Sequence, residues 1–117
     1  PSASSAASDV YKRQIIKDGE LESQQYRTDI GPIDILATDK NTGEYVVIEL
    51  KRNQTSDQTI GQIARYMQWV EENLNKGVKG VIVCGKWDEK LDYARKRMGD
   101  VEVLLYEVNF SLKEYKK

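Results

Sequence analysis

The sequence predicts a single α/β domain built on a central mixed sheet of about five strands flanked by helices. First, Val, Ile and Leu gather in short runs bounded by Gly, Pro, Asp and Asn, which is typical of strands. Second, residues 57–75 carry apolar side chains at helical spacing between two such runs. Third, 117 residues with 39% hydrophobic and 32% charged side chains suit one core.

The predicted elements follow one another in the order αβββαβαβ. We expect the first three strands to be mostly antiparallel, and the strand after the long helix to run parallel to a neighbour through a right-handed crossover. The elements are a helix over 3–15 with Gly19 ending it, strands over 21–28, 31–37 and 45–52, a helix over 57–75 with Asp57 as N-cap, a strand over 81–84, a helix over 88–98, a strand over 101–110 and a charged tail over 111–117.

Residues 1–14 differ in composition from the rest of the chain. They are rich in Ser and Ala and resemble an adaptor-derived stretch found fused to many unrelated predicted proteins. We therefore expect a non-native leader over 1–14, which could still form a helix, and a single domain over 15–117. A signal peptide is not expected, because no continuous apolar core follows a basic start.

Asp34, Glu49 and Lys51 are the candidate functional residues. Glu49 and Lys51 are two residues apart in an otherwise apolar strand, so they point to the same side. If residues 39–44 form the turn, Thr38 lies opposite Tyr45 and the pairing places Asp34 opposite Glu49, with Cβ atoms roughly 5 Å apart. Two carboxylates this close repel unless a cation lies between them, and Mg²⁺ (or Mn²⁺) suits two carboxylates and water.

A plainer interpretation of these residues also exists. Asp34 could cap a strand end, while Glu49 and Lys51 form a salt bridge on an exposed edge. The Pro-x-Asp motif, the compatible register and the apolar neighbours together favour the functional interpretation. Lys51 would then stand beside the ion, where it can orient or deprotonate a water or neutralise charge on a phosphate.

These residues carry a resemblance to a known family. Pro32-Ile33-Asp34 with Glu49-Leu50-Lys51 resembles the PD-(D/E)XK signature of metal-dependent nucleases. Three blocks, 31–37, 47–52 and 61–66, are similar to the nuclease domain of NucS-type (EndoMS) DNA endonucleases, over about 19–110. The resemblance implies a restriction-endonuclease-like core. It also implies that Asp34, Glu49 and Lys51 are catalytic, that Gln62 and Tyr66 flank the site from the long helix, and that the Leu50 carbonyl joins Asp34 and Glu49 as a metal ligand.

The activity implied by the resemblance is metal-dependent cleavage of DNA by an endonuclease. The expected partners are DNA and, as one option, a second copy of the chain. NucS-type enzymes carry a separate DNA-binding domain before the nuclease domain, so we expect a truncated or minimal form with weak affinity. In resembling nucleases the first helix contributes an acidic metal ligand, whereas here Asp9 is the only acid before residue 18 and no Glu precedes Glu20. The alternatives are a catalytically silent nucleic-acid-binding module and a purely structural fragment.

Composition excludes several other classes of function. The chain has no histidine, which excludes Ser-His-Asp and Cys-His catalysis and histidine-rich zinc sites. The single Cys84 predicts a small core residue, no intrachain disulfide and a reducing, cytoplasmic setting. No apolar run approaches the length of a membrane span. Because the net charge is -1, nucleic-acid binding requires a local basic patch.

Overall fold

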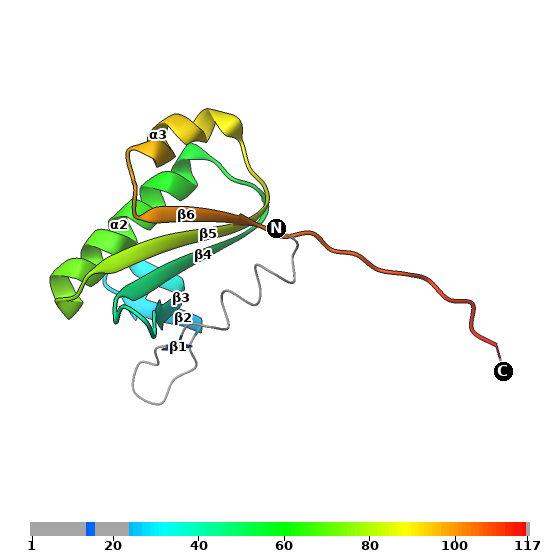
Figure 1. Cartoon of the computed structure of the whole chain (residues 1–117), viewed down its shortest axis with the longest axis horizontal. Helices are drawn as coiled ribbons and strands as arrows, with labels where there is room; N and C mark the ends of the chain where they lie inside the picture. Colours follow the sequence, from blue (N-terminus) through cyan, green and yellow to red (C-terminus); the bar gives the residue numbers. More distant parts are fainter. Residues whose placement is uncertain (1–13, 16–23, 117) are drawn as a thin grey trace.

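A computed structural model describes residues 14–15 and 24–116 of the chain. A mixed sheet, with strand order β1-β3-β4-β5-β6 and with β2 also paired to β3, forms the centre of the molecule (Figure 1). The elements are β1 (Gln14–Ile15), β2 (Gln24–Thr28), β3 (Gly31–Thr38), β4 (Tyr45–Gln54), α2 (Asp57–Leu74), β5 (Val78–Lys86), the 3-10 turn η1 (Glu89–Leu91), α3 (Asp92–Lys96) and β6 (Val101–Leu105).

The strand directions agree with the prediction. The strands β2, β3 and β4 pair antiparallel in chain order. The strand β5, which follows α2, runs parallel to β4, and β6 runs parallel to β5. This mixed sheet with helices packed against it confirms the α/β class and the central mixed sheet of the prediction.

The loop between β3 and β4 sets the register of these two strands. The Asp39 carboxylate accepts a hydrogen bond from the Asn41 backbone N–H at 2.9 Å, and this bond is the largest cause of the lowered pKa of Asp39. Lys79 of β5 lies 3.6 Å from that carboxylate and 3.3 Å from the carboxylate of Glu44. The loop therefore closes tightly and places Thr38 opposite Tyr45, as predicted.

Each face of the sheet carries its own group of buried side chains. The larger core lies between the sheet and α2, and includes Leu36 and Val47 from the strands with Ile63 and Val70 from the helix. Leu91 of η1 belongs to the same core, so the turn before α3 packs on this face too. The second group lies on the opposite face and comprises Ala37, Val46, Ile48, Val81 and Leu104. Because β4 is buried on both faces, it is the central strand that its apolar pattern predicts.

The long helix forms where predicted but is capped one residue earlier. Asp57 is its first helical residue, and Ser56, in extended conformation and without a side-chain capping bond, is the N-cap. The predicted capping role of Asp57 is therefore wrong, although its charge still lies in the first turn, where it favours the helix dipole. The helix ends at Asn75, which adopts the left-handed conformation common at helix ends.

Several predicted boundaries differ from the structure. Ile15 fits the predicted first helix, but it lies in β1 and pairs with Ala37 of β3. The edge of β3 supplies the hydrogen-bond partners of this strand, and the helical spacing of the sequence does not reveal them. The last strand ends at Leu105 and does not continue to Phe110, because residues beyond Tyr106 have no paired neighbour among the described residues. The rest of the predicted first helix and its end signal at Gly19 lie outside the described residues.

The short second helical segment is confirmed in part. Asp88 caps it as predicted, accepting a hydrogen bond from the Lys90 backbone N–H at 3.0 Å, but the segment is split into η1 and α3. No helix in the described part of the chain has the length and apolar character needed to cross a membrane.

Candidate active site

Asp34 lies where β3 and β4 separate. The paired positions of the two strands end at Ile35 and Ile48, and the same register continued by one residue places Asp34 opposite Glu49, as predicted. Beyond that point the Asp34 carboxylate Oδ2 accepts a hydrogen bond from the Leu50 backbone N–H at 2.9 Å. The Asp34 side chain thus accepts the hydrogen bond that a backbone carbonyl of a paired strand would otherwise accept. This bond holds the carboxylate against β4.

Glu49 is almost completely removed from water. Only 1% of its side chain is exposed, and its Oε1 has no hydrogen-bond partner among the described residues. The other oxygen, Oε2, lies 3.9 Å from Lys51 Nζ. A buried carboxylate oxygen without a donor is costly in a folded protein, so the arrangement calls for a proton or a cation at this atom.

The surroundings of Glu49 raise its pKa to about 7 from an ordinary value of 4.5. Burial is the main cause, because it disfavours the charged form. The negative charge of Asp34 raises the pKa further, Lys51 lowers it, and the hydrogen bond that a protonated Glu49 can donate to Asp34 raises it again. At neutral pH the Glu49 carboxyl is therefore poised between its neutral and charged forms.

Lys51 connects the carboxylates to the long helix. Its ammonium Nζ donates a hydrogen bond to the Gln62 side-chain Oε1 at 3.4 Å, so the ammonium lies between Glu49 and the N-terminal half of α2. About a third of the Lys51 side chain is exposed, which leaves the ammonium accessible to a ligand. The structure thus brings together four of the five side chains predicted for the site, those of Asp34, Glu49, Lys51 and Gln62, and the Leu50 backbone lies next to Asp34.

Tyr66 is placed differently from these four residues. It is 5% exposed and belongs to the core between α2 and the sheet. Its hydroxyl lies at the start of β3, against Gly31. From this position it packs against the start of the strand that carries Asp34.

Gly31 allows this close packing of Tyr66. Its φ is +126°, and a Cβ there would lie 2.7 Å from the Tyr66 hydroxyl. We expect Gly31→Ala to lower the free energy of unfolding by about 2–4 kcal/mol, from backbone strain together with overpacking. Gly43 also has a positive φ (+78°), but a Cβ added there would have nothing within 4 Å, so Gly43→Ala should cost only about 1–2 kcal/mol. Urea unfolding of both variants checks the difference, and equal losses would contradict the packing role.

Asp34 also borders a shallow pocket of about 240 Å³. Gln25, Ile35 and Leu50 complete its lining, so the Asp34 carboxylate is reachable from solvent. Gln25 has a φ of 57°, a conformation that few non-glycine residues adopt. Nothing in the sequence singles out Gln25, because a glutamine in a polar strand carries no signal of a site.

The donor atoms of the site fit a hard divalent cation. No group of three or more His, Cys, Asp and Glu side chains that could hold a metal occurs within the described residues. Mg²⁺, however, is commonly held by one or two carboxylates and otherwise keeps water. The buried Oε1 of Glu49, without a partner in the described structure and close to a second carboxylate, provides such a donor. The expectation that the first helix supplies no acidic ligand is not tested, because Asp9 and most of that segment lie outside the described residues.

Comparison with known proteins decides the family. The sequence model of one protein family, the endonuclease NucS C-terminal domain, matches residues 9–109, which is most of the chain. The chain belongs to this family. Among curated relatives, endonuclease NucS of Bifidobacterium adolescentis is 47% identical over 53 residues, which are 45% of this chain and 22% of that protein. The chain spans only about a quarter of the length of the curated NucS relatives that it matches.

Solved structures of two endonucleases have a similar fold. A repair endonuclease from Pyrococcus abyssi superimposes with a TM-score of 0.63 and 26% identity, over 70% of this chain and 35% of that one. The structure of an EndoMS–dsDNA complex gives a TM-score of 0.66 at 15% identity, over 92% of this chain and 46% of that one. The second likeness concerns the fold alone. The NucS family membership predicted from the three sequence blocks is thus confirmed.

Proposed function

We propose that the chain is a divalent-metal-dependent DNA endonuclease of the PD-(D/E)XK type, with a restriction-endonuclease-like core. The observation that carries the proposal is the buried Glu49 carboxylate close to Asp34: its Oε1 has no hydrogen-bond partner among the described residues, and its Oε2 lies 3.9 Å from Lys51 Nζ. Such an arrangement costs stability and has no structural benefit of its own, which is typical of a functional site. Membership of the NucS C-terminal domain family supports the choice of DNA as substrate.

Asp34, Glu49 and the Leu50 carbonyl would hold the metal, Mg²⁺ or Mn²⁺. When bound, the ion would stabilise negative charge on a phosphate and favour formation of hydroxide from water. Asp34 is oriented for this task by the Leu50 N–H, and Glu49 by its rigid, buried position.

Lys51 acts on the phosphate and the attacking water. Gln62 and Glu49 hold its ammonium from two sides, so its Nζ is fixed without being buried. A fixed ammonium can orient the water and neutralise charge that develops on the phosphate oxygens. The exposed Arg65, one turn beyond Gln62 on α2, would supply local positive charge for the DNA backbone. The single, buried Cys84 supports a reducing cytoplasmic setting for this chemistry.

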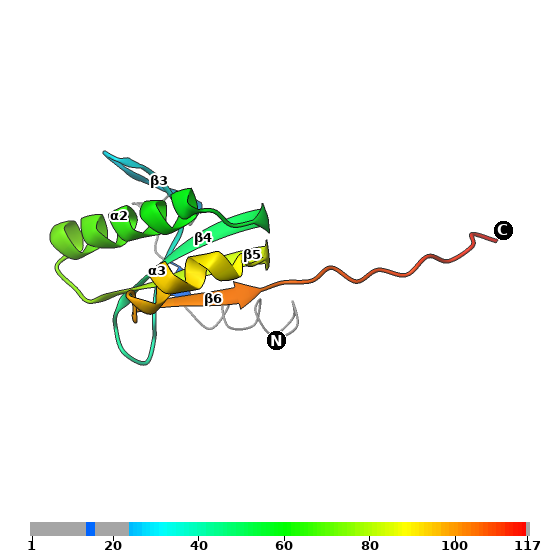
Figure 2. The same ribbon diagram turned by 90° about the horizontal axis from the view of Figure 1, so that it is seen from above.

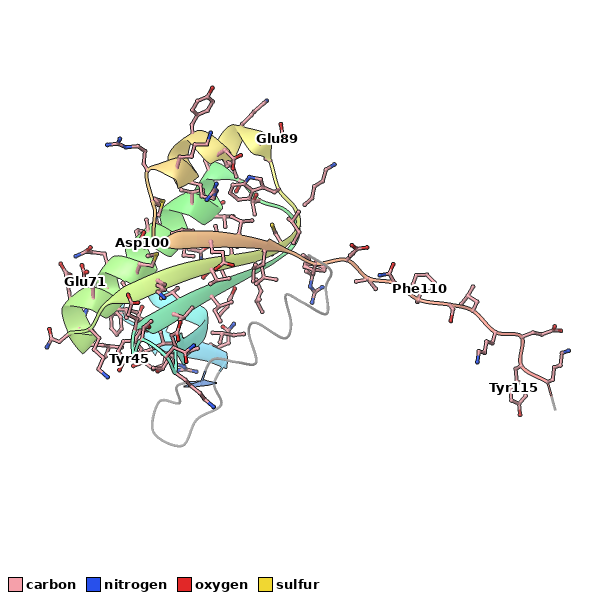
Figure 3. All side chains as sticks on the ribbon, in the orientation of Figure 1. Tyr45, Glu71, Glu89, Asp100, Phe110 and Tyr115 are labelled. Atoms are coloured by element: carbon pink, nitrogen blue, oxygen red, sulfur yellow. The ribbon has the colours of Figure 1, made fainter. Side chains whose placement is uncertain are left out.

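A cleavage panel tests the proposal. The 117-residue chain is incubated with single-stranded, branched, mismatched and fully paired DNA in Mg²⁺ or Mn²⁺, with and without a chelator. We expect cleavage of at least one substrate, and we expect the cleavage to disappear with the chelator and with Glu49→Ala. Glu71→Ala, which removes an exposed glutamate from the far end of α2, is the matched control and should cleave normally (Figure 3).

The other outcomes select the alternatives. DNA binding without cleavage, unchanged by the chelator, would identify a silent nucleic-acid-binding module. Neither binding nor cleavage, by a protein that circular dichroism shows to be folded, would make the carboxylates a structural charge network.

A further inference from the structure

The segment after β6 is extended and apolar at every second position. Tyr106 is still tied to the domain, because its N–H donates to the Cys84 carbonyl and its hydroxyl to the Arg52 carbonyl. Residues 107–116 then lead away from the sheet in the direction of β6 (Figure 2). Val108, Phe110 and Leu112 are 74%, 80% and 88% exposed, and the residues between them are polar. This alternation is typical of a strand with one face to bury.

Among the described residues, the strand β6 lies at the edge of the sheet. Among the described residues it pairs only with β5, so its outer backbone groups have no strand partner. A groove of about 410 Å³ runs beside it on the face that carries the helices. On the β6 side it is lined by Val101, Val103 and the 41% exposed Leu105, together with Glu102, and on the other side by Trp87, Asp92 and Arg95. An unpaired edge next to a groove with three apolar side chains on its β6 side is suited to the addition of another strand.

We propose that residues 107–113 of a second copy add antiparallel to this edge, and that the exchange is mutual. With Phe110 of one copy opposite Val103 of the other, Val108 lies opposite Leu105 and Leu112 opposite Val101. Residues directly opposite in an antiparallel pair point to the same face. All three apolar side chains of the added segment therefore enter the groove between β6 and α3.

The same register matches charge and symmetry. Lys113 comes opposite Asp100, so an exposed cation meets an exposed anion at the end of the pairing. Tyr106 of each copy comes opposite Glu107 of the other, which places a two-fold axis between these positions. A two-fold exchange is closed and pairs each edge once, so it does not continue into a fibre.

The direction of the segment favours a second copy over the chain's own groove. The groove lies beside β6, behind the point where the chain leaves the domain. Figures 1 and 2 both show the chain continuing outward from β6, and Figure 3 shows Phe110 and Tyr115 clear of the domain. To fill its own groove, the segment would have to reverse directly after Tyr106, which two hydrogen bonds hold in line with β6.

Cross-linking between two differently substituted proteins tests the exchange. Glu102→Cys and Ser111→Cys are made separately, mixed and oxidised; the two positions are directly opposite in the proposed register and both are exposed. We expect a disulfide-linked dimer from the mixture and much less from either protein alone. Asn109→Cys in place of Ser111→Cys is the register control, and should cross-link poorly to Glu102→Cys. Cys84 is buried, which keeps the native thiol out of the reaction.

Sedimentation velocity measures the association itself. We expect the unmodified chain to dimerise as its concentration rises, and Phe110→Asp to remain monomeric, because the dimer would lose the aromatic side chain and bury a carboxylate beside Asp92, which already pairs with Arg95. Tyr115→Asp changes an equally exposed aromatic outside the paired segment and should dimerise normally. A monomer at all concentrations, a dimer of Phe110→Asp, or no cross-link between positions 102 and 111 would overturn the proposal.

Discussion

Glu49→Gln should stabilise the metal-free protein at pH 8 by about 3 kcal/mol. The pKa of Glu49 is about 7 in the folded protein and 4.5 ordinarily, and each pKa unit corresponds to 1.36 kcal/mol. Below pH 4.5 the Glu49 carboxyl is protonated in both the folded and the unfolded protein, so it does not lower the free energy of unfolding. As the pH rises from 4.5 to 7, the unfolded chain ionises while the folded protein keeps its proton, so the free energy of unfolding falls. Glutamine keeps the shape of the protonated form and avoids this loss.

Urea unfolding of both proteins with a chelator, at pH 5 and pH 8, measures the effect. The wild type should lose stability between the two values, and Glu49→Gln should lose much less. Glu71→Gln, on the exposed surface of α2, is the control and should follow the wild type.

Thermal melting at pH 8 tests metal binding. Mg²⁺ should raise the melting temperature of the wild type and leave that of Glu49→Gln unchanged, because the variant lacks a metal ligand. Glu49 would be a structural residue if Mg²⁺ did not raise the melting temperature of the wild type and Glu49→Gln melted at a lower temperature than the wild type.

Lys51→Met should lower the rate of DNA cleavage by a factor on the order of 10²–10⁴. The substitution keeps most of the aliphatic stem and removes the ammonium between Glu49 and Gln62. Because one cation among several on the surface contributes only part of the backbone attraction, DNA affinity should change far less than the rate. Single-turnover cleavage and a binding titration on the same duplex separate the two quantities.

Lys40→Met is the matched control for this prediction. Lys40 is exposed in the loop between β3 and β4, at the other end of these strands from the site. This variant should cleave at the wild-type rate. If both variants lost the same small amount of activity and affinity, Lys51 would be one more surface cation and not part of the catalytic machinery.

Much of the fold and of the site followed from local patterns. The polar stretch over 39–44 between two apolar runs predicted a tight turn, and that turn determines the register that brings Asp34 opposite Glu49. The apolar residues at both parities of β4 predicted a central strand, because only a strand covered on both faces buries both sets. These conclusions needed only the period of the side chains and the length of the turn.

The limits of several elements could not be predicted in this way. Ile15 suited a helical pattern but pairs with Ala37, and Phe110 continued the alternation of β6 without a partner strand in the described chain. A strand exists only where a neighbour supplies hydrogen bonds, and that neighbour is distant in sequence. The period of the side chains is therefore a necessary condition for a strand and not a sufficient one.

The sequence by itself determined which groups the site contains: two carboxylates opposite each other, and a lysine on the face of Glu49. Only the tertiary structure decided how deeply these groups are buried and which atoms they contact. It buries Glu49 and leaves Oε1 without a partner among the described residues, ties Asp34 to the Leu50 N–H, directs Lys51 to Gln62 and places Tyr66 against Gly31. The physical reason is that burial and electrostatic environment depend on how α2 packs on the sheet, and this packing sums contacts between residues far apart in the chain.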